Sequence, residues 1–349
     1  MDPLRPALLR IPTLFGTTLL LCAALLLGGC ATSLSTGDAA AIAGKTYVVT
    51  GASSGLGRGV AERLGGLRAN VVLAARRGAV LEQVAARIEA AGGRALVVPT
   101  DVADAAQVER LAQAALARFG RIDVWINNAG VGAIGRFEEV PLADHARIVD
   151  VNLKGVIYGS HVALRQFRNQ GSGTLVNLGS VESVIPLAYH ASYASTKAAI
   201  LGLGRALNEE LRLARLDRVR VATIMPWATD TEFFNQAANY SGHRPRMPLM
   251  DDPLKVVDII VHATVHPREE VPTGWKARGA YWSHRIAPDL AERMAADIAH
   301  KAQYEQSPPA PHTSGAVHRP MEGTTGIDGG VRERMRQEDA QKNAMPDKQ

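Results

Sequence analysis

The sequence predicts an α/β fold, in which a doubly wound parallel sheet of about seven strands has helices on both faces. Short apolar, β-branched runs alternate with longer stretches of helical spacing from Lys45 to about Pro226, and such alternation indicates βαβ units. The apolar runs show no strict polar alternation, which is typical of strands buried on both faces. Ligands of such sheets bind beyond the carboxyl ends of the strands, so the residues after each strand are the first site candidates.

Each element follows from its own residues. The run TYVVT is β-branched and stops at a glycine, GLGRGVAERLGGL can wind as a helix, and AVLEQVAARIEAAGG combines helical spacing with a glycine stop. Beyond Pro226 the pattern is less regular, and a loop or small helices are expected. The predicted strands are 46–50, 70–75, 94–100, 122–130, 173–180 and 218–226, and the predicted helices are 55–67, 79–93, 104–120, 141–170, 192–215, 252–266 and 288–303.

The chain is predicted to have four parts. Residues 1–30 read as a signal peptide or membrane anchor, 31–43 as a linker and 44–304 as the α/β domain. Residues 305–349 are dominated by Pro, Gly, Ser and charges. Because few large apolar side chains remain there to offset the entropy of ordering, we expect this tail to be disordered.

Composition argues against several classes of function. The net charge of +5 comes largely from scattered arginines without a long basic run, so no nucleic-acid partner is expected. The two cysteines, Cys22 and Cys30, both lie near the N-terminus. The rest of the chain therefore has neither a disulfide nor a catalytic thiolate. The ten histidines show no HExxH-like spacing, and no metal site is expected.

The N-terminus has the pattern of a targeting segment. Arg5 and Arg10 are followed by no charge before Asp38, and small residues before Cys30 fit the processing site of a secretory signal. LGGC at 27–30 resembles the bacterial lipoprotein box, which implies a lipidated Cys30. An uncleaved membrane helix is the alternative, since the apolar length is about enough to span a bilayer, and a misassigned start codon is a third. We expect membrane association through the N-terminus, with the side of the membrane open.

A glycine-rich loop, TGASSGLG, spans Thr50 to Gly57, directly after the first strand and before a helix. Glycines allow a tight turn and close approach to a pyrophosphate, and the helix N-terminus offers N–H donors and the positive end of its dipole. The spacing of Gly51, Gly55 and Gly57 is G-x-x-x-G-x-G. A simple strand-to-helix turn is the alternative, but the position at the start of a βαβ unit favours a dinucleotide coenzyme.

With this loop the sequence resembles the short-chain dehydrogenase/reductase family. The resemblance continues through NNAG at 127–130, Asn152, Ser180 and the pair Tyr193-x-x-x-Lys197, and it covers about residues 44–232. It implies a Rossmann-type domain that binds a nicotinamide coenzyme. The implied coenzyme contacts are Gly51, Ser53, Ser54, Gly55, Leu56, Gly57, Asp101, Val102, Asn128, Gly130, Tyr193, Lys197 and Thr231, with Thr229 as an alternative to Thr231.

The residues after the second strand bear on the choice of coenzyme. An acidic residue at this place would bind the adenosine ribose and repel a 2′-phosphate, and LAARRG contains none. Arg76 and Arg77 can instead make charge-assisted hydrogen bonds to that phosphate. Two ordinary surface arginines are the alternative. We expect NADP(H) in preference to NAD(H).

The family resemblance assigns the chemistry to four residues. Hydride transfer to a carbonyl leaves negative charge on oxygen, so a proton donor is needed, and the resemblance makes Tyr193 that donor. A tyrosine has a pKa near 10, and a lysine one turn away, Lys197, favours its ionised form. By resemblance Ser180 holds the substrate oxygen, and Asn152 holds a water that resupplies the proton. The alternative roles are a turn hydroxyl for Ser180, a polar helix residue for Asn152 and a surface charge for Lys197.

Candidate substrate contacts are Ile185, Tyr189 and Trp227, in VESVIPLAYH and in PWATDT after the sixth strand. Trp227 replaces the glycine usual in the family, which raises the question of backbone strain there. Apolar Phe233 and Phe234, with Tyr240, favour an apolar ketone, aldehyde or secondary alcohol as the small-molecule substrate, although these side chains could equally pack the loop.

Other functions were weighed against this one. The stretch 274–288, rich in Trp, Tyr and cations, could lie on a membrane or form a homo-oligomer contact. A non-catalytic nucleotide-binding sensor or scaffold at a membrane is the alternative function, and the four filled catalytic positions argue against it. Sugar-nucleotide epimerisation is disfavoured by the short C-terminal part of the domain.

Overall fold

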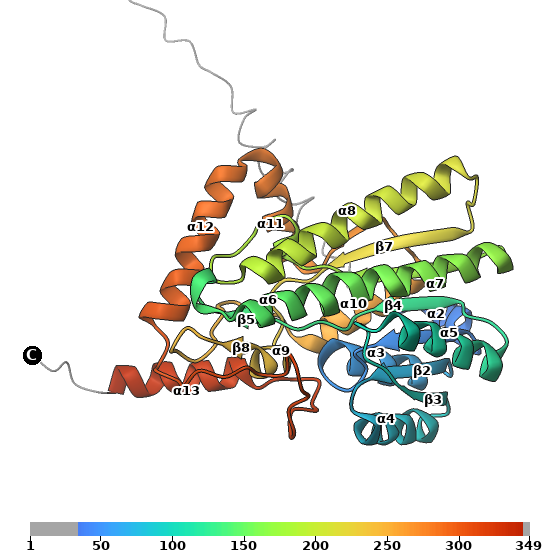
Figure 1. Ribbon diagram of the computed structural model, residues 1–349, viewed down its shortest axis with the longest axis horizontal. Helices are drawn as coiled ribbons and strands as arrows, with labels where there is room; N and C mark the ends of the chain where they lie inside the picture. The colour runs from blue at the N-terminus through green and yellow to red at the C-terminus, as the bar shows by residue number, and fades with distance from the viewer. Residues whose placement is uncertain (1–33, 345–349) are drawn as a thin grey trace, which may run out of the picture. The chain divides into compact units, whose positions relative to one another are not determined.

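The computed structural model describes residues 34–344. A seven-stranded sheet of order β3-β2-β1-β4-β6-β7-β9 forms its centre (Figure 1). Every neighbouring pair in this sheet is parallel, which confirms the predicted fold class. The strands are β1 (Thr46–Thr50), β2 (Asn70–Ala75), β3 (Arg94–Pro99), β4 (Val124–Asn127), β6 (Gly173–Leu178), β7 (Val219–Met225) and β9 (Glu270–Pro272).

Two apolar clusters cover the two faces of the sheet. Tyr47 and Val49 of β1 point into the cluster formed with α3 (Gly55–Gly66), α4 (Gly78–Ala90) and α10 (Pro253–Val265). Val48, between them, points into the opposite cluster, where Trp125 and Phe167 are fully buried. The helices of that second face are α5 (Ala105–Phe119), α7 (Gly155–Gln170) and α8 (Ala191–Leu213). Successive residues of a strand therefore point to opposite faces of the sheet, and both faces are buried from solvent.

The long helix predicted at 141–170 contains an irregularity that bears on the site. It consists of α6 (Leu142–Val149), a π-helical turn η2 (Asp150–Lys154) and α7. A π turn inserts one extra residue into a helix and is frequent at functional sites. Asn152 occupies the middle of this turn and is completely buried.

The structure differs from the linker predicted at 31–43. Residues Thr36–Ile42 form helix α2. Ser35 accepts a hydrogen bond from the Asp38 N–H, while the Asp38 carboxylate accepts one from the Ser35 N–H. This capping box satisfies helix-end donors locally, and buried Ile42 fixes the helix on the core. The signal or anchor predicted for 1–30 lies outside the described residues.

The predicted disordered tail also differs from the structure, because residues 305–344 are ordered. Val317 and Val331 are completely buried, and helix α13 (Val331–Ala344) ends the described chain. The carboxylate of Asp230 accepts hydrogen bonds from the N–H groups of Val331 and Arg332. The composition argument counted apolar side chains, whereas this segment is held by two buried valines and many hydrogen bonds to its backbone.

The remaining elements lie at the carboxyl end of the sheet. A two-stranded parallel pair joins β5 (Ala133–Ile134) to β8 (Ala238–Asn239). The other short elements are η1 (Phe137–Glu139), α9 (Phe233–Gln236) and η3 (Val181–Ser183), which packs against α8. A helical hairpin of α11 (Gly274–Ile286) and α12 (Pro288–His300) continues into η4 (Lys301–Glu305) (Figure 1). Within residues 34–344, no helix is both long and apolar enough to cross a membrane.

Candidate active site

A cavity of about 530 Å³ opens at the carboxyl ends of the parallel strands, where the sequence analysis placed the site. Three of the predicted site residues, Gly57, Asn152 and Tyr189, do not line it. The predicted residues that do are Gly51, Ser53, Ser54, Gly55, Leu56, Arg76, Arg77, Asp101, Val102, Asn128, Gly130, Ser180, Ile185, Tyr193, Lys197, Trp227 and both Thr229 and Thr231.

The glycine loop brings backbone unusually close to backbone. Gly51 has a φ of +69°, and a Cβ there would lie 2.7 Å from Asn128 Nδ2. A Cβ on Gly57 would lie 2.4 Å from the Gly51 oxygen. Gly57 therefore allows the start of α3 to pack against the loop, although it does not line the cavity. The Gly55 N–H donates to the Gly326 oxygen. The next N–H groups of α3 lack partners within the helix and lie beside the cavity, which fits the phosphate group that the resemblance implies.

Polar side chains fix the floor of the coenzyme half. Asn128 donates from Nδ2 to the Thr50 oxygen at 2.9 Å and so ties β4 to the glycine loop. Asp101 accepts a hydrogen bond from the Ala103 N–H and forms an ion pair with Arg147. Val102 beside it is nearly buried. Arg147, which was not predicted, orients the carboxylate that the resemblance assigns to the adenine.

Ser180, Tyr193 and Lys197 converge on the other half of the cavity. Lys197 Nζ lies 5.4 Å from the centre of the Tyr193 ring and donates to the Leu178 oxygen at 2.6 Å. The Ser180 hydroxyl accepts a hydrogen bond from the Glu182 N–H at 3.1 Å. A Cβ on Gly130 would lie 3.9 Å from Lys197 Nζ, so Gly130 packs directly beside this amino group.

The protonation of this group differs from the sequence expectation. Burial raises the pKa of Tyr193, the charge of Glu182 raises it further, and a hydrogen bond with Ser180 lowers it in part. Burial also lowers the pKa of Lys197 to about 8, although Glu182 opposes this shift. A lysine that is partly neutral near pH 8 stabilises the phenolate less than a full charge would. The protein alone therefore holds Tyr193 as a protonated phenol.

Asn152 lies one layer behind Lys197. The π turn directs its side chain onto Val131, with Oδ1 accepting from the Val131 N–H at 2.8 Å and Nδ2 donating to the Val131 oxygen at 2.9 Å. Nδ2 also lies 3.3 Å from Thr196 Oγ1. Asn152 thus joins the loop after β4 to α8, and it does not itself reach the cavity.

Glu182 and His190 form a titratable pair that sequence reasoning missed. Both line the cavity, and Glu182 Oε1 lies 3.1 Å from His190 Nδ1. Glu182 Oε2 is buried, with no hydrogen-bond partner among the described residues. Burial alone would lower the pKa of His190, but the Glu182 carboxylate outweighs it and raises that pKa. The only signal in the sequence was an acid two residues after Ser180.

Trp227 and Ile185 line the cavity as predicted. Trp227 has no positive φ and donates to the Leu249 oxygen at 3.1 Å, so its replacement of the family glycine causes no such strain. Phe233 also reaches the cavity, and its ring lies 5.4 Å from that of Tyr193.

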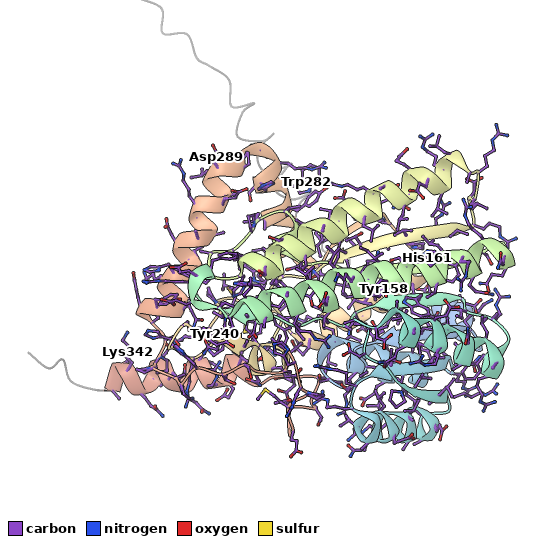
Figure 2. The ribbon with its side chains drawn as sticks, in the orientation of Figure 1. Tyr158, His161, Tyr240, Trp282, Asp289 and Lys342 are labelled. Carbon is purple, nitrogen blue, oxygen red and sulfur yellow. The ribbon has the colours of Figure 1, made fainter. Side chains whose placement is uncertain are left out.

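The structure places Tyr189 elsewhere. Its backbone has a φ of +70°, its hydroxyl lies 2.7 Å from His300 Nδ1, and its ring lies 4.5 Å from that of Tyr304. The partners come from the end of α12 and from η4, which the sequence did not connect to this residue. Tyr240 also points away from the cavity and donates to Asp144 (Figure 2).

The α11–α12 hairpin contributes an apolar wall that was not predicted. Leu290, Met294 and Ile298 recur on one face of α12, line the cavity, and remain about half exposed. Trp282 of α11 and Asp289 of α12 both belong to the turned end of the hairpin (Figure 2). The substrate side of the cavity is therefore apolar and open along α12.

One group of potential metal ligands converges within residues 34–344, away from the cavity. The ligand atoms of Asp38, His262 and His266 lie within 4.8 Å of one another. His262 and His266 are four residues apart at the end of α10, as in HExxH, but the glutamate of that pattern is absent. The Asp38 carboxylate and His266 Nε2 already lie 2.7 Å apart in a hydrogen bond, which accounts for the contact without an ion, so we assign no metal there.

Known proteins resemble this chain over most of the described domain. A family model for short chain dehydrogenase matches residues 45–240. YxnA, an uncharacterised oxidoreductase of Bacillus subtilis, is 30% identical over 277 residues, which cover 78% of each chain. A 3beta-hydroxysteroid dehydrogenase of Eggerthella lenta is 39% identical over 193 residues, which cover 54% of this chain and 72% of that one.

Solved structures show the same fold. An alcohol dehydrogenase of Thermococcus sibiricus, in complex with 5-hydroxy-NADP, is 29% identical with a TM-score of 0.56, covering 65% of this chain and 93% of that one. A 3-ketoacyl-(acyl-carrier-protein) reductase of Brucella melitensis, in complex with NADH, is 29% identical with a TM-score of 0.57, covering 64% and 91%. The chain belongs to the short-chain dehydrogenase family and is an oxidoreductase that acts on CH–OH or C=O groups with a nicotinamide coenzyme.

Proposed function

We propose that the protein transfers hydride between NADP(H) and an apolar ketone, aldehyde or secondary alcohol. The observation that carries this proposal is the convergence of Ser180, Tyr193 and Lys197 on one cavity. That cavity has an apolar wall at its substrate end and Arg76 and Arg77 at its other end. The segment after β2, LAARRG, has no acidic residue, and a guanidinium group there suits a 2′-phosphate.

Each residue has a defined task in this proposal. The coenzyme, when bound, supplies or accepts the hydride. Ser180 holds the substrate oxygen, and Tyr193 gives a proton to that oxygen during reduction. Its phenol is protonated in the free protein, which suits reduction. Lys197 binds the nicotinamide ribose and returns the proton to Tyr193, while Asn152 acts as a positioning residue through Val131.

The substrate class follows from the wall of the cavity. Leu290, Met294 and Ile298 form an apolar stripe, and Phe233 closes the space beside Tyr193. Burying such surfaces against a ligand is favourable by about 25 cal/mol per Å². A sugar would leave its hydroxyl groups without partners along this stripe, so an extended apolar carbonyl compound is favoured.

The test is turnover of a ketone and alcohol panel with both coenzymes. Tyr193→Phe is expected to lower kcat by at least about 100-fold, because it removes the proton donor, while coenzyme affinity stays near that of the wild type. Tyr158→Phe, on α7 and outside the cavity (Figure 2), is the matched control. Unchanged turnover in Tyr193→Phe would refute the catalytic assignment. Coenzyme binding with no turnover across the panel would favour a nucleotide-binding sensor.

We also propose that the N-terminal segment attaches the enzyme to a membrane. Arg5, Arg10 and the apolar run before Cys30 support this proposal at the level of sequence. Intact-protein mass spectrometry on the membrane fraction tests it. A chain that begins at a lipidated Cys30 would support a lipoprotein, whereas a full-length chain in the membrane fraction would support an anchor.

A further inference from the structure

The segment from Ala316 to Gly326, here called the strap, lies against the glycine loop and the two arginines after β2. Ala316, Pro320 and Met321 line the same cavity as Gly55 and Arg76. In Figure 1 the strap belongs to the red chain that joins α12 to α13. Residues from the far C-terminal part of the chain are thus built into the predicted coenzyme site.

The strap and the glycine loop together use all the hydrogen-bond donors of Arg77. A guanidinium group has five N–H donors. Arg77 Nη1 donates to the oxygens of Met321 and Thr324 at 3.0 and 2.9 Å. Its Nε and Nη2 make three contacts with the hydroxyls of Ser53 and Ser54, at 3.0–3.2 Å. These five contacts leave Arg77 without a donor for another ligand.

Arg76 is committed only in part. Its Nη1 lies 3.5 Å from the Val317 oxygen and 2.9 Å from the His318 oxygen, and its Nη2 donates to the Ala316 oxygen at 2.7 Å. Among residues 34–344 these are its hydrogen bonds, so Nε–H and one Nη2–H remain available. Carbonyl oxygens carry no charge, so the positive charges of both arginines stay uncompensated by the strap itself.

The far end of the strap reaches the start of α3. The Gly55 N–H donates to the Gly326 oxygen at 2.8 Å, and Arg58 Nη1 donates to the Thr325 oxygen at 2.7 Å. Gln236 of α9 donates to the Thr324 oxygen at 2.7 Å. One donor of the helix N-terminus, which would otherwise face a phosphate, is therefore taken by the chain itself.

Two anchors outside the cavity hold the strap. Val317 is completely buried in the cluster that contains Ile148, and the His318 side chain lies 2.8 Å from the Asp144 carboxylate of α6. Arg319, the next residue, is exposed, and no hydrogen bond of its side chain is formed within residues 34–344. The anchors can therefore be changed without touching the cavity, and Arg319 offers a control.

We propose that the strap is a component of the coenzyme site and covers the adenosine end of that site. Arg77 holds the strap in place, and Arg76 binds the 2′-phosphate. Coenzyme exchange then requires the strap to loosen. The inference rests on the proposed use of NADP(H), and it adds which arginine selects the coenzyme and what limits coenzyme release.

The first test compares the two arginines in the full-length protein by titration with NADPH and NADH. Arg76→Met is expected to weaken the binding of both coenzymes, because Arg76 also holds the strap through the Ala316 and His318 oxygens. NADPH should lose about 10- to 100-fold more affinity than NADH, the value of a charge-assisted hydrogen bond to the 2′-phosphate. Arg77→Met is expected to weaken both coenzymes alike, since it unfastens a shared cover. A selective loss of NADPH binding in Arg77→Met would overturn the assignment, as would equal loss of both coenzymes in Arg76→Met.

The second test measures the strap directly. Hydrogen exchange at Ala316 and Gly326 is expected to slow when NADPH is added. NADPH release, followed by fluorescence after addition of excess NADP⁺, is expected to be about threefold or more faster in His318→Ala, and faster still in Val317→Ser. Arg319→Ala should match the wild type. Unchanged release in both anchor variants, with strap exchange shown to be faster, would overturn the proposal.

These outcomes separate the strap from the proposed function. If neither coenzyme binds the wild-type protein, the proposed function fails as well as the strap. Suppose that both coenzymes bind and that turnover depends on Tyr193, but that the rate of hydrogen exchange at Ala316 and Gly326 does not change when the coenzyme is added. In that case only the proposal for the strap is refuted.

Discussion

Replacing Glu182 by Gln is predicted to move the pH dependence of the reaction to lower pH. Glu182 lies beside His190, whose ring is 6.4 Å from that of Tyr193. Burial is the main cause of the raised pKa of Tyr193, and the Glu182 charge raises it further. Removing the charge therefore lowers that pKa. Phenolate, the base needed for alcohol oxidation, then forms at lower pH.

The size of the shift follows from Coulomb's law. Because Glu182 and Tyr193 both lie beside His190, their separation is that of one intervening side chain. At an effective dielectric constant near 20, a charge at such a separation contributes about 2 kcal/mol, or roughly 1.5 pKa units. Glu182 also raises the pKa of Lys197, so its removal makes the ammonium group weaker support for the phenolate. This opposing effect reduces the expected net shift to about one unit.

The assay is the pH profile of kcat/KM for oxidation of the best alcohol in the panel, between about pH 6 and pH 10. Glu182→Asp keeps the charge and should retain the wild-type profile more closely than Glu182→Gln. Glu138→Gln, in η1, controls for loss of a remote carboxylate. If Glu182→Gln has a normal circular dichroism spectrum and a profile that superimposes on the wild type, the carboxylate does not act on Tyr193 and the reasoning fails.

Three further outcomes are expected. Because Glu182 raises the pKa of His190 above its usual 6.5, the ion pair stabilises the fold fully below that value and less as pH rises. The loss of Tm in His190→Asn should therefore be larger at about pH 5 than at about pH 9. A loss of Tm that does not depend on pH would contradict this expectation. Gly57→Ala should cost about 1–3 kcal/mol by urea unfolding and weaken coenzyme binding, because its Cβ would lie 2.4 Å from the Gly51 oxygen; Gly66→Ala, with nothing within 4 Å, should be neutral or stabilising. Phe167→Ala, at a fully buried site, should cost about 3–5 kcal/mol, and an unfolding midpoint close to that of the wild type would show that the cluster collapses around the gap.

The sheet and the catalytic group could be predicted because their signals are local. The runs around Val48 and Trp125 show burial on both faces, and the four-residue step from Tyr193 to Lys197 fixes their common helix face. The strand β9 escaped prediction because three residues carry too little pattern. The π turn at Asn152 escaped because nothing in its composition distinguishes it from an ordinary helix.

The parts of the site that were missed depend on contacts between distant segments. His300 and Tyr304 draw Tyr189 away from the cavity, and neither is near it in sequence. The strap carries few apolar residues, so composition indicated disorder. Its order comes from carbonyl oxygens that meet Arg76 and Arg77, and backbone acceptors leave no trace in a residue pattern.

The strap also affects when the coenzyme site can form during protein synthesis. Gly55 and Gly326, which share a hydrogen bond, are 271 residues apart in the chain. At a synthesis rate of about 5–20 residues per second, the glycine loop emerges roughly 15–50 s before its last partner. When Pro272 completes the last strand of the sheet, Gly326 is still to be synthesised, so the nascent chain then has its sheet but not its closed nucleotide pocket. A closed coenzyme site therefore cannot form until the strap has left the ribosome, and pausing of synthesis before Gly326 would delay coenzyme binding.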